Sequence, residues 1–537
     1  MKKKTLLFPL IYTVIFLITP IFSSAQEMGL DDKINEAFTP IANWWGSVVL
    51  HDFPGTSIPT IIILLVGGAL FFTLYFGFVN IRRIPTAIQT VRGKYDALDH
   101  HSSGASDLAI DDDIKDTIHD ESQEGEVSHF QALATAVSGT VGNGNIAGVA
   151  LAIAVGGPGA TFWMILCGLL GMSTKFVECT LGVRYRDIGE DGTVYGGPMY
   201  YLTKGLKERG LAKIGKLLAI IFAVLCIGAS FGGGNAAQSN QAAMQLVSSF
   251  GLTGGSARTI IGIIMMIFVG IIIIGGIKRI ASVTEKVVPF MALSYVLACL
   301  YIIITNFSFV DDAFGMIFTQ AFNPQAGLGG LLGVLITGFR RAAFSNEAGA
   351  GSASIAHSAV KTKYPASEGL VALLEPFIDT VVICTMTALV IIIFNGDNTI
   401  FEYGGEGGRV IIDGVAVEGA GITSAAFSQY ISFAGPFLTI AVVLFAVSTM
   451  ISWSYYGLQS WMYLFGKSKI ADLSYKILFL IFVVIGAAGD MSAVWTFSDA
   501  MILALVFPNM VGLILLYPRV KEELGRYLSA IRKMNNS

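Results

Sequence analysis

The chain has 537 residues, of which 54% are hydrophobic and only 13% are charged. Soluble domains usually contain about 25% charged residues, so this composition excludes an ordinary soluble protein and indicates an all-α polytopic membrane protein. The net charge of −4 gives no sign of a nucleic-acid partner.

The chain begins with a pattern typical of a cleavable secretory signal. Residues 1–25 start with lysines, continue with an apolar stretch and end in small residues. An uncleaved helix is the alternative. Residues 26–57 are then expected to be a periplasmic N-terminal segment, and 58–79 is the first run long enough to span a bilayer.

Ten further apolar runs predict ten further transmembrane helices, eleven in all. They lie near residues 130–155, 160–183, 217–248, 257–276, 285–305, 327–357, 368–394, 432–457, 472–488 and 495–517. Residues 95–128 form an acidic linker that is expected to be solvated. In 395–431, an Asp-Gly pair between β-branched runs predicts a hairpin. Residues 518–537 read as a tail.

The positive charges predict the orientation of these spans. If the mature N-terminus is outside, 25 Lys and Arg residues fall on the cytoplasmic side, whereas Lys33, Arg258 and Arg409 fall outside. This is a strong positive-inside bias. It predicts a multi-pass protein of a bacterial inner membrane with a cytoplasmic linker, an outer hairpin and a cytoplasmic C-terminal tail.

Two of the spans contain residues that weaken a helix. "AVSGTVGNGNIAGVALAIAV" (136–155) contains Gly142 and Gly144, and "SNEAGAGS" (345–352) contains Gly349 and Gly351. Each break opens a run of five spans, so we expect two repeats, 130–305 and 327–517. Inverted-repeat transporters carry such paired breaks around their binding site, where freed backbone groups bind ions and carboxylates.

Other interpretations of the breaks stay open. The glycines could only allow close helix packing, and "TVGNG" (140–144) is similar to a potassium-channel filter, which makes an ion channel an alternative of a different class. The sequence has no phosphate-binding loop for ATP and no motif of a hydrolase. It therefore predicts transport driven by a gradient, without ATP and without enzyme activity.

Several stretches together resemble the alanine or glycine:cation symporter family. They are "GTVGNGNIAGVALAIAVGGPGATFWM", "MSTKFVECTLGVRYR", "GTVYGGPMYYL", "RRAAFSNEAGAGSASIAHSAV", "LEPFIDT" and "STMISWSYYG". The resemblance implies a core like the bacterial leucine transporter fold, a 5+5 inverted repeat with two broken helices, preceded here by one extra helix at 58–79.

The resemblance also implies a sodium site. The carbonyls of Ser138 and Val141 and the hydroxyls of Ser448 and Thr449 would supply its oxygen ligands, which suit a hard cation. Thr140 and Asn145 are additional candidates. Backbone hydrogen bonding within their own helix is the alternative role for Ser448 and Thr449. No organic cofactor is implied; Na⁺ is the coupling ion.

The implied amino-acid site lies between the two breaks. Amides near Gly142, Asn143 and Gly144 would hold the carboxylate, and carbonyls near Phe344 and Ser345 the ammonium. The remaining candidates are Gln241, Gly349, Gly351 and Trp453. Gln241 could instead bind another helix, and Phe344 and Trp453 could be core aromatics.

The sequence therefore predicts a symporter that imports alanine or glycine with Na⁺ by alternating access. Proton coupling is the alternative of the same class. Three carboxylates at membrane depth, Glu347, Glu375 and Asp379, are further candidates for function, because an unpaired ion there is costly. Ion pairing with residues such as Arg340 and Arg341 is the structural alternative for them.

Overall fold

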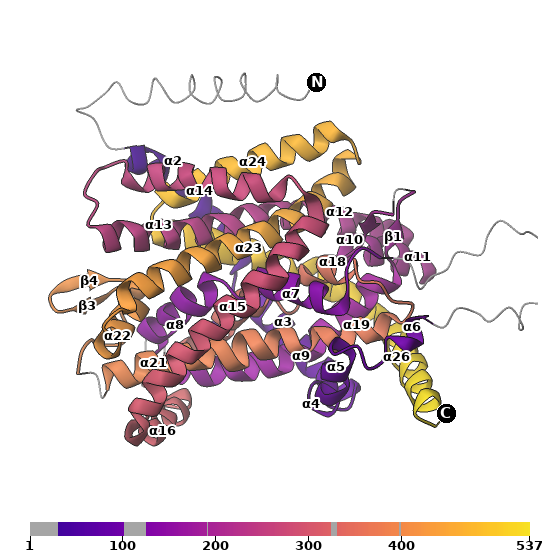
Figure 1. Cartoon of the computed structure of the whole chain (residues 1–537), viewed down its shortest axis with the longest axis horizontal. Coiled ribbons are helices and arrows are strands. Elements are labelled where there is room, and N and C mark those ends of the chain that lie inside the picture. The colour runs from indigo at the N-terminus through magenta and orange to yellow at the C-terminus, as the bar shows by residue number, and fades with distance from the viewer. Residues whose placement is uncertain (1–29, 101–124, 191, 324–329, 397–398, 537) are drawn as a thin grey trace, which may run out of the picture.

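The computed structural model describes residues 30–100, 125–190, 192–323, 330–396 and 399–536. The expected signal segment and most of the acidic linker lie outside the described residues. Within them the chain is almost entirely helical, with two short antiparallel strand pairs (Figure 1).

The first half of the chain, up to residue 323, contains helices of very different length. They are α2 (Leu30–Val49), α3 (Thr60–Tyr75), α4 (Val79–Arg82), α5 (Ile84–Val91), α6 (Ala97–His100), α7 (His129–Thr140), η3 (Gly144–Gly148), α8 (Val149–Gly156), α9 (Gly159–Arg184), α10 (Pro198–Tyr200), η4 (Tyr201–Gly205), α11 (Leu206–Glu208), α12 (Ala212–Phe231), η5 (Gly232–Ala236), α13 (Ala237–Phe250), α14 (Ala257–Ile273), α15 (Gly276–Thr305), η6 (Phe307–Phe309) and α16 (Val310–Ala321). Strands β1 (Asp187–Ile188) and β2 (Val194–Tyr195) pair after α9.

The rest of the chain, from residue 330, contains the remaining helices. Its helices are α17 (Gly330–Asn346), α18 (Ala353–His357), α19 (Pro365–Ala372), α20 (Leu374–Pro376), η7 (Phe377–Cys384), α21 (Thr385–Asn395), η8 (Glu406–Gly408), α22 (Ala420–Tyr430), α23 (Ala434–Phe465), α24 (Lys469–Ala488), α25 (Met491–Ala504) and α26 (Val506–Asn536). Strands β3 (Val410–Ile412) and β4 (Val415–Val417) pair around Asp413 and Gly414, the turn expected from the sequence.

Seven helices of the described residues are long and apolar enough to cross a membrane. A bent pair, 129–140 with 144–156, adds an eighth span, and α3 and α14 are shorter apolar helices. The molecule is thus a polytopic, all-α membrane protein. The helices α17 and α18 are each too short to count by length, so the total of eleven spans and the 5+5 repeat stay predictions.

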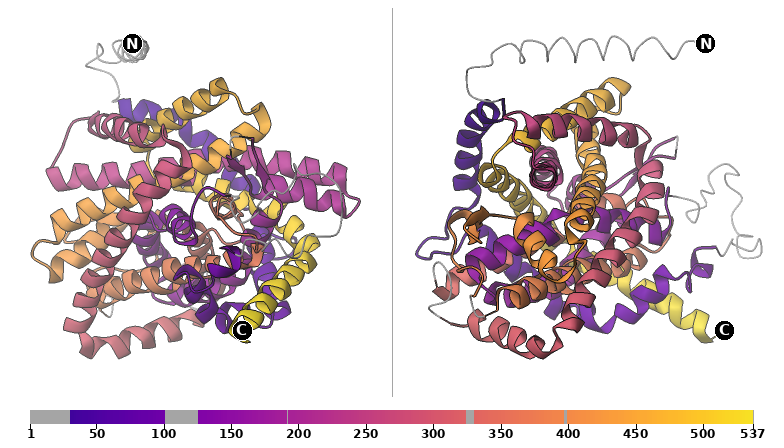
Figure 2. Two further views of the ribbon diagram at one scale, coloured as in Figure 1. Left: turned by 45° about the vertical axis from the view of Figure 1, so that its right-hand side comes forward. Right: turned by 60° about the vertical axis from the view of Figure 1, so that its left-hand side comes forward.

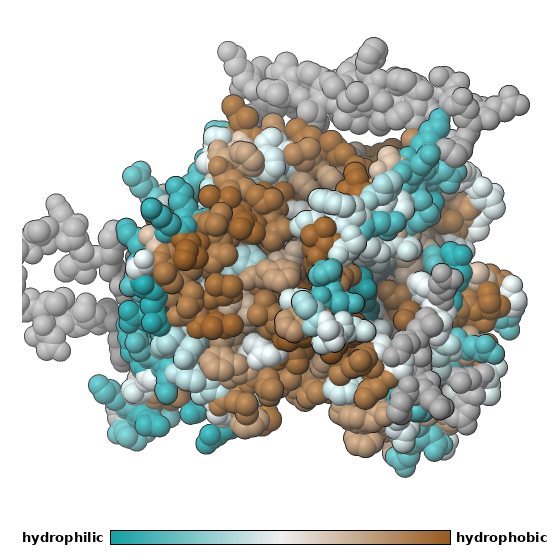
Figure 3. All heavy atoms as spheres, turned by 180° about the vertical axis from the view of Figure 1, so that it is seen from behind, coloured by the Kyte–Doolittle hydropathy of each residue, from teal (hydrophilic) through white to brown (hydrophobic). Residues whose placement is uncertain are grey.

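Hydrophobic side chains cover the outside of the bundle where lipid would lie. Figure 3 shows them gathered in a broad central area, with hydrophilic residues along the left edge. Large apolar residues of α14 and α15 are more than half exposed, among them Phe268, Phe290 and Leu293. Such a surface is stable only against another apolar phase.

The N-terminal segment differs from a simple extramembrane stretch, because Leu30–Val49 folds as a helix. This helix, α2, packs against α25, with Phe38 edge-on to Phe497 at a centroid distance of 5.2 Å. Asp31 forms an ion pair with Arg258 of α14. The C-terminal tail is also helical, since α26 runs unbroken through Pro518 to Asn536.

The two broken segments lie inside the bundle. All of η3 and nearly all of α7 are buried, because α15, α17, α18, α22 and α23 pack around them. The hairpin β3–β4 and the C-terminus lie at opposite ends of the molecule (Figure 1), and Figure 2 shows the same packing from two other directions. The region between the breaks is therefore shielded on every side by helices.

Candidate functional site

The first break separates α7 from η3 and α8. Helix α7 begins with a capping box between Ser128 and Gln131 and ends at Thr140. Val141 is extended, and the following helix is bent by 50° relative to α7. The Asn145 side chain accepts a hydrogen bond from the Gly142 amide at 2.8 Å, so the sequence supplies its own partner for a backbone group that the break releases.

Helix α23 contacts the first break through Thr449, one of the expected sodium ligands. The Thr449 hydroxyl donates to the Ser138 carbonyl at 3.1 Å, and a Cβ at Gly142 would collide with the same hydroxyl. Ser448 differs, because its hydroxyl donates to Phe445 O within its own helix at 3.0 Å. The structure thus brings together Ser138, Gly142 and Thr449, and it turns the Ser448 hydroxyl away.

Thr140 and Asn145, the additional ligand candidates, have other partners. The Thr140 hydroxyl donates to carbonyls of its own helix, at 3.3 and 3.4 Å. Asn145 donates to Asp379 Oδ1 at 2.6 Å and to Ser345 Oγ at 3.2 Å. Ser345 in turn donates to Asp379 Oδ2 at 2.8 Å. The buried Asp379 carboxylate therefore joins the two breaks through η7.

The second break lies between α17 and α18 and is held by carboxylates. Glu347 has a left-handed backbone (φ 55°), accepts a hydrogen bond from Trp453 Nε1 at 2.8 Å and another from Ser352. The Gly349 amide donates to Glu178 Oε1 at 2.8 Å, and the Asn509 side-chain amide donates to Glu178 Oε1 at 2.9 Å and to the Gly349 carbonyl at 2.8 Å. Gly349 and Gly351 have φ values of 93° and 82°, which favour glycine.

The expected substrate residues divide into two groups in space. Phe344 and Ser345 lie against Gly144, where an added Cβ would be 3.4 Å from Phe344 Cδ1 and 3.6 Å from Ser345 Cα. Gly349 and Gly351 lie elsewhere, with Leu65, Met510, Pro198 and Asn509 around them. The glycines of the second break therefore shape the turn and do not face the first break.

Gln238, which the sequence analysis did not single out, contacts the first break, where Gln241 was expected. Its Oε1 accepts a hydrogen bond from the Asn143 amide at 3.0 Å. Gln241 instead accepts from the Ala420 amide of α22 at 3.1 Å. Both belong to "NAAQSNQAAM" and are three residues apart, so both lie on one side of α13 and the sequence alone does not distinguish them.

A π-helical turn between α12 and α13, the segment η5, makes room for the aromatic residues Phe344 and Trp453. The segment η5 has the sequence GGGNA. A Cβ at Gly234 would collide with Trp453, and one at Gly233 would lie 3.3 Å from Phe344 Cε2. The three consecutive glycines of the sequence could have indicated that the backbone of η5 comes close to other side chains. Trp453 and Phe344 are both buried, at 1% and 5% exposure.

Unpartnered polar atoms remain next to the first break. In the described part of the chain, Asn143 Oδ1 and Tyr456 OH are buried without a hydrogen-bond partner. Tyr456 OH lies 3.0 Å from the Cβ that Gly139 would carry. Buried polar groups are normally paired, so these atoms indicate a place where a polar ligand can bind.

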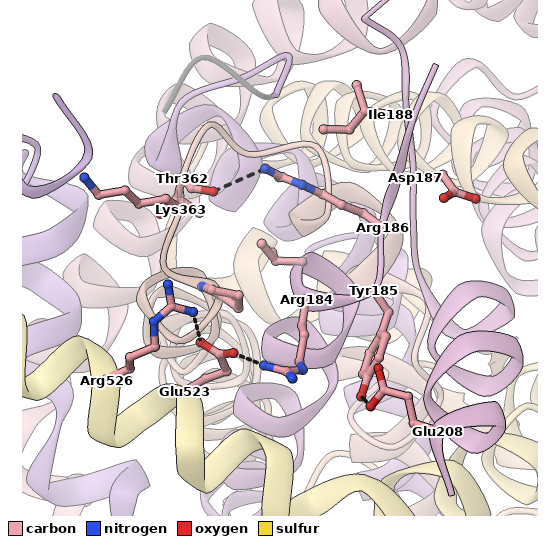
Figure 4. Close-up of a pocket in the computed structure, with 12 residues that line it drawn as sticks. Arg184, Tyr185, Arg186, Asp187, Ile188, Glu208, Thr362, Lys363, Glu523 and Arg526 are labelled. Atoms are coloured by element: carbon pink, nitrogen blue, oxygen red, sulfur yellow. Dashed lines mark hydrogen bonds and ion pairs between the residues drawn. The ribbon is translucent and has the colours of Figure 1, made fainter. Parts of the chain in front are cut away.

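A cavity lies next to the C-terminal helix α26. It has a volume of about 480 Å³ and many charged lining residues, including Arg184, Glu523 and Arg526 (Figure 4). The Glu523 carboxylate pairs with both arginines. Burial and the Glu208 carboxylate raise the pKa of the Tyr185 phenol. The Arg184–Glu523 ion pair therefore links α9 to α26.

Comparisons with known proteins give one consistent result. Residues 46–537 match a family described as the sodium:alanine symporter family. The "Sodium/alanine symporter AgcS" of Methanococcus maripaludis is 39% identical over 477 residues, which are 88% of this chain and 95% of that protein. The "Probable sodium/glutamine symporter GlnT" of Bacillus subtilis is 32% identical over 469 residues, 87% of both chains.

One solved structure with a similar outline is MhsT in complex with L-phenylalanine. It is 14% identical in sequence, has a TM-score of 0.49, and the match covers 74% of this chain and 100% of that one.

Proposed function

This chain belongs to the sodium:alanine symporter family, and we propose that it imports alanine or glycine together with Na⁺ by alternating access. Membership in this family makes it a transporter and not an enzyme. Coupled amino-acid symport with Na⁺ is the general activity of such a protein, so the choice of amino acid and the residues that bind it are the parts that need a structural argument.

One observation carries the proposal: a carbonyl and a hydroxyl from different helices meet at a break in α7–α8. The Ser138 carbonyl and Thr449 Oγ1 are 3.1 Å apart and buried. Both are oxygen ligands of the kind that a hard cation takes. We assign them to the sodium site, together with the carbonyl of Val141. Ser448 contributes only if its hydroxyl leaves Phe445 O.

The amino acid would bind beside this ion, between the first break and α17. The Asn143 amide is held by Gln238 and the Gly142 amide by Asn145. A substrate carboxylate can take the place of these side-chain oxygens, whereas its ammonium can approach Asn143 Oδ1 or the carbonyls near Ser345. Because Phe344 and Trp453 fill the space around Gly144 and Gly234, only a small side chain fits.

The proposal includes the membrane arrangement. Eleven spans result if α3, the bent α7–α8 pair, the α17–α18 pair and eight other helical segments each cross once. The two broken pairs then open two five-helix repeats, with the mature N-terminus outside and the C-terminus in the cytoplasm of a bacterial inner membrane. The strong positive-inside bias of the sequence supports this orientation.

Uptake into proteoliposomes tests the proposed function. Labelled alanine, glycine, glutamine and leucine are offered under an imposed Na⁺, Li⁺ or H⁺ gradient. We expect Na⁺-driven accumulation of alanine or glycine, little of leucine or glutamine, and no accumulation without a gradient. Equal uptake of glutamine would contradict the assignment of Phe344 and Trp453 as a size limit.

Proton coupling is the second candidate, and a chain of buried ionisable groups favours it. Lys175 Nζ lies 3.0 Å from Glu375 Oε1, and His357 lies 3.4 Å from Glu375 and 2.5 Å from Glu368. His129, which is 8% exposed, continues the chain by pairing with Glu368. Accumulation driven by an H⁺ gradient in Na⁺-free medium would favour this candidate over sodium coupling.

A further inference from the structure

The geometry points to a second binding site for a zwitterionic amino acid, in a cavity between α8, α17 and α25. We infer that this cavity holds the substrate briefly before it reaches the breaks; the inference rests on the proposed function for the identity of the ligand. The cavity has a volume of about 230 Å³. Sites for drug-sized ligands usually measure about 300–1,000 Å³, so this one suits a smaller molecule.

Two arginines and one aspartate line the cavity. Asp499 Oδ2 forms an ion pair with Arg340 Nε at 2.7 Å and another with Arg341. Arg341 and Asp499 are buried, at 5% and 1% exposure. With two positive charges and one negative charge, the three side chains carry one net positive charge, and the Arg340 side chain, which is 29% exposed, is the more accessible of the two arginines.

Unpartnered atoms of both polarities remain at this cavity. Asp499 Oδ1, Arg341 Nη1 and Trp495 Nε1 have no hydrogen-bond partner among the described residues, although all three side chains are at most 5% exposed. A carboxylate can accept from Arg341 and Trp495, and an ammonium can donate to Asp499 Oδ1. A simple anion would leave the aspartate oxygen unpaired, and an amine would leave the arginine unpaired, so a zwitterion fits best.

The position of the cavity suits a site on the path to the breaks. It is lined by Gly407 and Ser492, which are exposed, and Gly407 lies shortly before the β3–β4 hairpin. On the inner side, the Arg341 guanidinium stacks on Phe344 and Trp495, at 5.7 and 5.1 Å from their centroids. These two rings, 4.8 Å apart, separate the cavity from Gly144.

Equilibrium binding of labelled L-alanine to the purified full-length protein in Na⁺ tests this inference. We expect two classes of site in the unchanged protein. Asp499→Asn should remove one class and retain the other. Asp490→Asn is the matched control, because Asp490 directly precedes the same helix, is exposed and does not line the cavity. This control should keep both classes.

A second variant keeps the test valid if Asp499→Asn does not fold. Thr337→Phe fills the cavity from α17 and leaves all three charged side chains in place; it should also remove one class. Lactate, which has a carboxylate but no ammonium, should compete for this class at least about tenfold more weakly than glycine does.

The outcomes separate this inference from the proposed function. A single class of alanine site that persists in Asp499→Asn and in Thr337→Phe would overturn the second site and leave the symporter assignment intact. Equal competition by chloride, lactate and glycine would show an anion site and would also overturn it. No alanine binding in any variant, together with no uptake, would mean that the proposed substrate itself is wrong.

Discussion

Thr449 and Ser448 are neighbours on α23, but their hydroxyls have different partners. Thr449 donates across to the Ser138 carbonyl of α7, whereas Ser448 donates to Phe445 within its own helix. The family resemblance treats the two hydroxyls alike. In the structure only the Thr449 hydroxyl contacts α7, so substitutions of Thr449 and Ser448 form a matched pair for testing the sodium site.

Thr449→Val should raise the Na⁺ concentration for half-maximal alanine uptake about tenfold or more. The change removes one oxygen ligand and keeps the shape of the side chain, and a hydrogen bond to a charged group is worth about 1.5–3 kcal/mol. Ser448→Ala should change this concentration much less. Uptake measured over a range of Na⁺ concentrations checks both. A larger effect in Ser448→Ala than in Thr449→Val would show that Ser448, and not Thr449, is the sodium ligand on α23.

Gly142 and Gly144 predict a second contrast at the same break. An added methyl group at Gly142 collides with the Thr449 hydroxyl, whereas one at Gly144 meets Phe344 at an ordinary contact distance of 3.4 Å. Gly142→Ala should therefore abolish Na⁺-dependent uptake, and Gly144→Ala should retain a measurable part of it. Both proteins must be monodisperse after purification. Full activity of Gly142→Ala would exclude a close approach of Thr449 to the break.

Gln238 shows where residue-level prediction from the sequence reaches its limit. The polar pattern of "NAAQSNQAAM" correctly indicates a side of α13 that meets polar partners, but both Gln238 and Gln241 lie on it. Only the packing distance to the first break selects Gln238. The same limit applies to Gly349 and Gly351. Their φ values show a turn in the structure, but the sequence does not show which neighbouring helices this turn faces.

Among the features of the helices, the two breaks could be predicted best from the sequence. The side chains that bind the broken segments could be predicted least. Glycines and asparagine inside an apolar span mark the bend in α7–α8, since they weaken a helix locally. The partners that hold the breaks come from distant elements: Asp379 from η7, Glu178 from α9 and Asn509 from α26. Such pairings depend on the three-dimensional arrangement, which one sequence does not reveal.

The link between α9 and α20 is a buried ion pair, Lys175 with Glu375, both with fully buried side chains. The sequence analysis considered arginines such as Arg340 and Arg341, and not Lys175, as ion-pair partners of Glu375. Lys175→Met should destabilise the protein by about 3–5 kcal/mol, because it leaves Glu375 buried without its lysine. Lys175→Met combined with Glu375→Leu should recover much of that loss. Thermal unfolding in detergent measures both. Equal losses in the single and double variants would mean that the pair is not the source.

The link between α9 and α26 predicts an effect on mobility. Glu523 holds Arg184 and Arg526 (Figure 4) and is 2% exposed. Glu523→Gln should weaken both pairs, so amide hydrogens after residue 523 should exchange about tenfold faster. Glu522→Gln is the control, because its side chain is exposed and pairs with Arg519. Unchanged exchange in Glu523→Gln would show that the helix is held by apolar packing alone.

For the whole molecule, composition and charge placement predicted a polytopic helical membrane protein, and the long apolar helices agree with that. The helical form of the N-terminal segment was not predicted, because the charged residues of α2 lie near its N-terminal end and the helix packs against α25, which is distant in sequence. The number of crossings and their direction depend on the membrane, so they need a direct test.

Labelling of single cysteines supplies that test and uses opposite ends of the molecule. Cysteines placed at Lys361 and Val415 are suitable because both positions are exposed, while the five native cysteines are free and buried and should react slowly. In intact cells, a membrane-impermeant maleimide should label position 415 and not 361; after the membrane is opened, it should label both. Trp44→Cys on α2 should behave like position 415. Labelling of position 361 but not 415 in intact cells would mean that the orientation is the reverse of the proposed one. Labelling of both positions from the same side would mean that the segment α19–α21 between them does not cross the membrane once, as proposed.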